Sequence, residues 1–73
     1  MALIPLIYAD VGAPSIIGRV AGDDEVKQHL ETLGFTVGAT VSIVNTLAGN
    51  LIVQVKESRV ALSRNLASKI FVK

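Results

Sequence analysis

Residues 40–62 read TVSIVNTLAGNLIVQVKESRVAL and contain three short apolar runs separated by two turn signals. Apolar and polar side chains alternate along these runs, a pattern typical of half-buried β-strands. The turns at Ala48-Gly-Asn50 and Glu57-Ser58 are short enough to join neighbouring antiparallel strands. The stretch therefore predicts a three-stranded meander. Its expected inward rows are Val41 and Ile43, then Leu51, Val53 and Val55, then Val60 and Leu62.

Residues 15–21, SIIGRVA, predict another strand before the meander. Alternation places Ile16 on the inward face and Ile17 on the opposite face. Gly18 indicates a bend or a close approach of another backbone segment.

Residues 22–35, GDDEVKQHLETLGF, predict a helix from about Asp24 to Leu33. Gly22 or Asp23 can cap its N-terminus, and acidic side chains in its first turn suit the positive end of the helix dipole. The spacing of its apolar residues predicts one buried stripe. That stripe consists of Val26, Leu30 and Leu33.

Gly34 is the expected end of this helix. A left-handed glycine there would bring Leu30 and Phe35 together as the hydrophobic pair of a Schellman motif.

The C-terminal residues predict one further turn and one further strand. Residues 63–68 suit a single capped turn of the 3₁₀ type, and residues 69–73 form a strand with Ile70 and Val72 facing inward. The complete order favours a mainly β fold: a small SH3-like barrel of five strands, with one helix between the first two. The alternative is a single antiparallel sheet with the helix on one face.

The composition predicts one domain covering residues 1–73, with 51% hydrophobic and 18% charged residues. A net charge of +1 and three scattered aromatic residues argue against nucleic-acid binding. The apolar opening meets Pro5 and then Asp10, too early for a signal peptide or a membrane span. Without cysteine there is neither a disulfide framework nor a thiolate metal site. The excess of apolar residues favours a surface that contacts a partner protein. Weak self-association of the chain through such a surface is a further possibility.

Few residues offer chemistry. Glu25 and His29 lie four residues apart and could present a carboxylate and an imidazole to a divalent metal from one helix face. Two ligands do not make a tight site, so we expect no cofactor beyond adventitious metal. The acids of residues 23–25 are explained by capping, and no serine lies in a recognisable catalytic context. No phosphate-binding loop is present, so we do not expect the chain to bind GTP itself. Because no complete catalytic site can be assembled, the sequence predicts a protein that is not an enzyme.

Taken together, these stretches resemble the ferrous iron transport protein A (FeoA) family over nearly the whole chain. The matching parts are Pro5-Leu6, Gly12, residues 16–22, the helix end at residues 30–35, Gly38, and residues 49–62 and 66–72. The resemblance implies an SH3-like barrel in the cytoplasm that acts in ferrous-iron uptake. It also implies a partner, the membrane transporter FeoB with its cytosolic G-protein domain.

The same domain type resembles the C-terminal module of metal-dependent repressors, so a metal-responsive regulatory or iron-binding role is the alternative. Partner contact requires apolar residues outside the core. Strand faces opposite the inward rows are expected to carry Ile17, Val44, Ile52, Ala61 and Phe71. The residues predicted to contact the partner are Leu33, Phe35, Leu47, Ile52 and Phe71. The alternative, which the sequence favours equally, is that the helix and residues 3–7 cover the outer strand faces.

Overall fold

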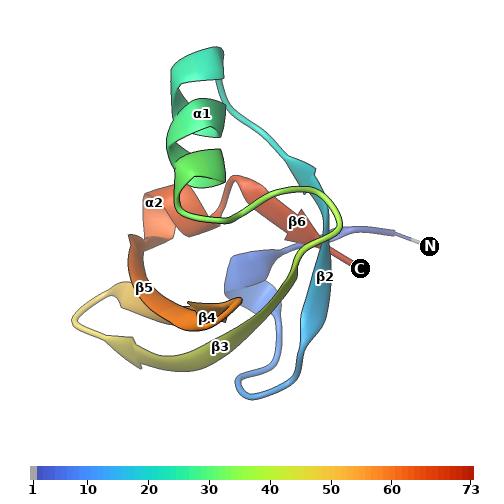
Figure 1. Ribbon diagram of the computed structural model, residues 1–73. Helices are drawn as coiled ribbons and strands as arrows, with labels where there is room; N and C mark the ends of the chain where they lie inside the picture. The colour runs from blue at the N-terminus through green and yellow to red at the C-terminus, as the bar shows by residue number, and fades with distance from the viewer. Residues whose placement is uncertain (1) are drawn as a thin grey trace.

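The computed structural model describes residues 2–73 as one strongly bent antiparallel sheet with a projecting helix (Figure 1). The elements in chain order are β1 (Ile4–Pro5), the 3₁₀ helix η1 (Leu6–Tyr8), β2 (Ser15–Val20), α1 (Asp24–Thr32), β3 (Thr40–Leu47), β4 (Asn50–Val55), β5 (Ser58–Ser63), α2 (Arg64–Ala67) and β6 (Ile70–Val72).

The sheet has the strand order β1-β6-β2-β3-β4-β5, and all of these pairs are antiparallel. The mainly β fold and the meander β3-β4-β5 are confirmed. The count of five strands was wrong, because the two-residue strand β1 pairs with β6 through Ile4 and Val72. Two residues with one proline give no strand signal in a sequence. The ladder does not close into a ring, so β1 and β5 are its edges.

The sheet encloses one core rather than lying flat beneath the helix. Every inward residue predicted in the meander is buried except Val60, which is half-buried. From outside the sheet, Leu6, Leu30, Phe35 and Ala67 complete this core. The helix α1 thus contributes one fully buried residue, and Figure 1 shows it standing away from the sheet.

A β-bulge reverses the predicted faces of β2. The register passes from Ile17 opposite Val72 to Arg19 opposite Phe71, so Gly18 is an extra residue in this strand. The shift places Ile17 inward, where it is fully buried, and leaves Ile16 exposed. Our assignment of Ile17 to the outer face was therefore wrong. A side chain rather than another backbone segment approaches Gly18, because a Cβ there would meet Leu3 Cδ2 at 2.6 Å.

Both ends of α1 have the predicted structure. The Val26 amide donates to Asp23 Oδ1 at 3.0 Å, so Asp23 is the N-cap. Gly34 has φ +104°, and the Phe35 amide donates to the Leu30 carbonyl at 2.9 Å, as in a Schellman motif. The predicted turn before β6 is also capped, because the Leu66 amide donates a hydrogen bond to the Ser63 hydroxyl oxygen. This turn is the short α-helix α2 and not the 3₁₀ turn that we predicted.

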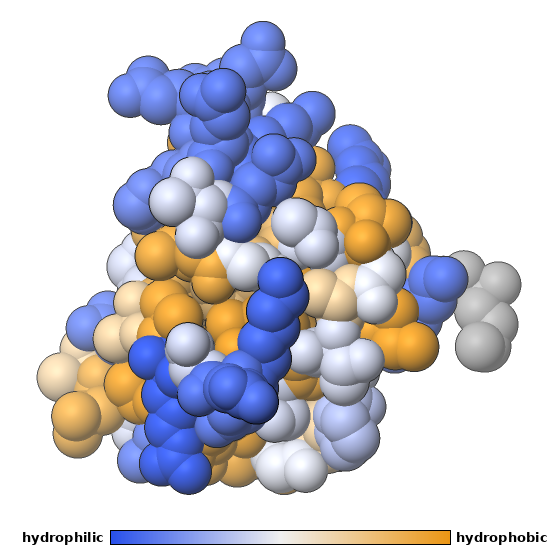
Figure 2. All heavy atoms as spheres, viewed as in Figure 1, coloured by the Kyte–Doolittle hydropathy of each residue, from blue (hydrophilic) through white to orange (hydrophobic). Residues whose placement is uncertain are grey.

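Within residues 2–73, no helix is long and apolar enough to cross a membrane. Figure 2 shows that α1 is strongly hydrophilic, whereas hydrophobic residues gather over the body of the molecule below it.

Candidate partner-binding surface

Two of the predicted contact residues share the outer face of β3-β4-β5. Leu47 pairs with Asn50 at the end of the first hairpin, and Ile52 lies two residues further along β4. Residues two apart on a strand face the same side, so Leu47 and Ile52 are diagonal neighbours. Leu47 is 66% exposed and Ile52 is half-buried. Ala61 lies opposite Ile52 on β5 and extends this face.

The register also explains why the alternation in β3 breaks at Val44. In β3, Ile43 pairs with Val53 and Asn45 with Ile52, which makes Val44 an extra residue. This β-bulge accounts for the break in alternation at Val44, which is half-buried.

Phe71 lies on a different part of the surface. It is on β6, which is separated from β4 by β2 and β3 in the sheet order, and it is half-buried. The guanidinium of Arg19 lies 5.7 Å from the centroid of its ring, within the range of a cation–π contact. Phe71 therefore belongs to the outer face of β6 and β2 and does not join Leu47 and Ile52.

The prediction that Phe35 contacts a partner is contradicted by its burial. Its side chain is 0% exposed and belongs to the core. The Schellman motif turns the residue after Gly34 back against the helix, and that geometry carries Phe35 inward. Leu33, the C-cap of α1, is half-buried and packs against the same core.

Several exposed apolar residues were not among the predicted contacts. These are Ile4, Tyr8, Val11, Ile16 and Val37, each at least 43% exposed. The turn glycines Gly12 and Gly38 stand next to Val11 and Val37 and indicate loop positions for them. Nothing in the local sequence gave the exposure of Ile16, which depends on the bulge at Gly18.

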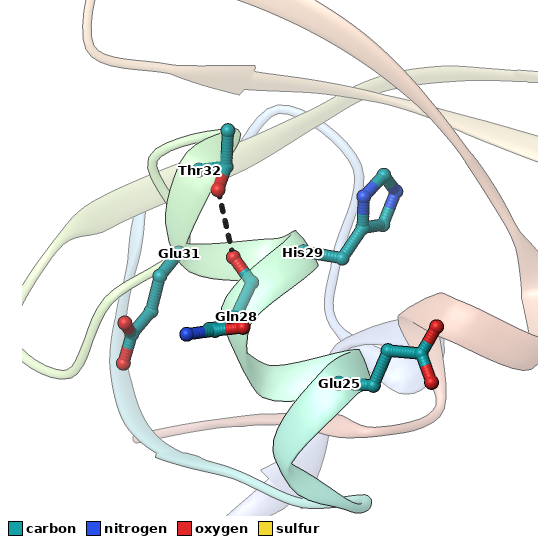
Figure 3. Close-up of a pocket in the computed structure, with 5 residues that line it drawn as sticks. All are labelled: Glu25, Gln28, His29, Glu31 and Thr32. Atoms are coloured by element: carbon teal, nitrogen blue, oxygen red, sulfur yellow. Dashed lines mark hydrogen bonds between the residues drawn. The ribbon is translucent and has the colours of Figure 1, made fainter.

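Glu25 and His29 line a surface hollow along α1, together with Gln28, Glu31 and Thr32. In Figure 3 the two side chains leave the same side of the helix, while Gln28 and Glu31 point to the other side. Both candidate ligands are exposed. Within residues 2–73, no three histidine, aspartate or glutamate residues are grouped closely enough to hold a metal ion. The hollow thus offers at most this pair of ligands.

The bent antiparallel sheet, the single main helix and the outward apolar residues define the class: a small SH3-like β-domain with an exposed surface on β3-β4-β5. The FeoA domain family model matches residues 4–73, so the chain belongs to the FeoA domain family, which is involved in ferrous-iron transport.

The chain is 29% identical over 70 residues to a "Putative Fe(2+) transport protein A" of Methanocaldococcus jannaschii, covering 96% of this chain and 85% of the relative. A crystal structure of an iron uptake regulatory protein, FeoA, superposes with a TM-score of 0.90 at 27% identity, covering 100% of this chain and 97% of that one.

Two further structures share the fold. The FeoA of Stenotrophomonas maltophilia complexed with zinc, described as a prokaryotic SH3 domain protein, has a TM-score of 0.81 at 24% identity, with 100% and 91% of the chains covered. A manganese-dependent transcriptional repressor in complex with manganese has a TM-score of 0.90 at 17% identity, and the match covers 100% of this chain but 37% of the repressor. The SH3-like fold is thereby confirmed.

Proposed function

We propose that this protein is a cytosolic, non-enzymatic accessory of ferrous-iron uptake that docks on the cytosolic region of the membrane transporter FeoB. The observation that carries the proposal is membership of the FeoA domain family over residues 4–73. The structure supplies a suitable contact surface, since Leu47 and Ile52 share one outer sheet face. Docking there would remove apolar area from water, which is the main favourable term in association.

Co-purification with the detergent-solubilised transporter tests this function, and Leu47→Asp is the informative variant. A carboxylate buried in an apolar contact without a partner is costly, so we expect recovery with the transporter to fall about tenfold or more. Val37→Asp is the matched control, because Val37 is also 66% exposed but lies in the loop before β3. Circular dichroism should show that both variants keep the fold.

Failure of the wild-type chain to associate with the transporter in GTP, in GDP and without nucleotide would contradict the proposal. Equal loss in both variants would show that Leu47 is not a specific contact.

The second candidate is a metal-responsive or iron-binding module, and Glu25 and His29 are its only supporting residues within the hollow. Two exposed ligands on one helix leave most coordination positions to water, so we expect no tight Fe²⁺ binding. Anaerobic titration calorimetry of the wild type and of His29→Ala checks this. Tight binding that disappears in His29→Ala would favour the regulatory role over the docking role.

A further inference from the structure

β5 presents an open backbone edge. It is the last strand of the sheet that residues 2–73 form. In antiparallel pairs, residues alternate between bonding the partner strand and directing their backbone groups away from it. Val55 and Ser58 close the two-residue hairpin, so Arg59 and Ala61 direct their N–H and C=O groups to the free side.

This free edge is accessible. Arg59 and Ala61 are exposed, and within residues 2–73 no backbone hydrogen bond joins this side of β5 to another segment. The opposite edge of the sheet differs, because β1 has two residues and one of them is Pro5, which has no N–H. Short strands and prolines are common ways to block unwanted pairing. β5 has six residues, no proline and no bulge.

The charges around β5 favour an acidic occupant. Lys56 precedes the strand, Arg59 lies within it and Arg64 follows it, whereas Glu57 is the single acid between residues 56 and 64. The acids of α1 belong to an element that makes few contacts with β5. A second copy of this chain fits less well, because its β5 region carries the same three cations and single acid, so two paired β5 edges would repel each other overall.

We propose that β5 binds an extended, acidic segment of a partner protein, which joins the sheet as an additional strand. Backbone hydrogen bonds to Arg59 and Ala61 supply the part of the affinity that does not depend on the sequence of the bound segment, as in other cases of strand addition. Acidic side chains on the outer face approach Arg59, and apolar side chains on the inner face continue the row of Val60. The inference deepens the proposed function and rests on it only for assigning the segment to the transporter.

Nuclear magnetic resonance titration with the peptide VEVEVEV tests the edge directly. We expect the amide resonances of Arg59 and Ala61 to shift and their hydrogen exchange to slow. The peptide VKVKVKV should bind about tenfold more weakly, because its charges meet the cations of β5. Binding of the acidic peptide should also weaken as the salt concentration rises.

Ala61→Pro removes one edge N–H that does not bond to β4, so the β4-β5 ladder can remain. We expect about a tenfold loss of peptide affinity. Ala61→Gly is the control, since it also changes the backbone freedom at this position but keeps the N–H. A peptide N-methylated at the amides that face β5 tests the same bonds from the other side, even if Ala61→Pro fails to fold.

Arg59→Glu should reverse the preference toward VKVKVKV, and Lys27→Glu, an equal change of net charge on exposed α1, should not. Binding that shifts no edge amide, tolerates N-methylation or ignores peptide charge would overturn the inference. If the acidic peptide binds but the transporter does not, the proposed function fails and the edge site stands. If the transporter binds wild type and Ala61→Pro equally well and the peptide does not bind, the edge inference alone fails.

Discussion

At Ala48 the backbone adopts a conformation that non-glycine residues rarely take. Ala48 has φ +52° and Gly49 has φ +82° in the two-residue loop between β3 and β4. Two consecutive positive φ values define a type I′ turn, whose twist matches the flanking strands. The hairpin therefore imposes strain on Ala48, where asparagine is the preferred residue.

Replacing Ala48 with asparagine should stabilise the protein. Asparagine tolerates the left-handed region better than alanine, so we expect the free energy of unfolding to rise by about 0.5 to 1 kcal/mol in urea denaturation. Ala13→Asn is the control, because Ala13 is exposed and has no positive φ. An unchanged midpoint for Ala48→Asn would show that the hairpin relaxes without cost.

At the scale of the element, α1 depends on its ends more than on its buried face. The helix has nine residues, and Leu30 is the one that is fully buried. Isolated helices of this length are marginal in water. The N-cap at Asp23 and the Schellman motif at Gly34 satisfy backbone groups that would otherwise lack partners.

Asp23→Ala should therefore destabilise α1. Losing the bond to the Val26 amide is expected to cost about 1 kcal/mol, measured by urea denaturation and by faster hydrogen exchange in the first turn of α1. Asp24→Ala is the matched control, because Asp24 lies in the first turn without capping it, so its loss should cost only a few tenths of a kcal/mol. Equal effects of both changes would mean that charge alone stabilises this end of the helix.

At the scale of the whole molecule, one small core holds together the sheet, α1 and α2. Phe35 is the largest of the fully buried side chains, and it comes from the loop between α1 and β3. A domain of this length has a total stability of roughly 4 to 11 kcal/mol. Loss of a single large core residue is therefore comparable with the whole stability.

Phe35→Ala should leave the protein close to unfolding. Truncating a buried phenylalanine costs about 3 to 5 kcal/mol through lost burial and the cavity that remains. Phe71→Ala removes the same ring from a half-buried outer position, so we expect about 1 kcal/mol. Chemical denaturation of both variants checks the difference, and similar costs would contradict the core assignment of Phe35.

Local patterns predicted most of the elements. The alternation in residues 40–62 gave three strands and their inward rows, and the capping residues gave both ends of α1. The errors have two physical causes. The bulge at Gly18 reverses the faces of β2, and the tertiary partner of Ile4 lies at the other end of the chain. Neither a bulge position nor a pairing over this separation has a local signature.

The candidate surface was predicted in part. Exposure at Leu47 follows from its place beside a hairpin turn, and Ile52 follows from alternation. The burial of Phe35 could not be predicted, because a residue that follows the end of a helix can point inward or outward. Its burial depends on which distant segments pack against it. The open edge of β5 also lay beyond the sequence, because a strand pattern does not say whether one or two neighbours pair with it.

The sequence by itself determined that this chain forms short strands and a capped helix, since periodicity, turn glycines and capping side chains act over a few residues. Only the tertiary structure decided that Ile17 and Phe35 are buried and that the edge of β5 stays free. Those outcomes depend on contacts between segments distant in the chain, where bulges set the facing of side chains and the strand order sets the edges.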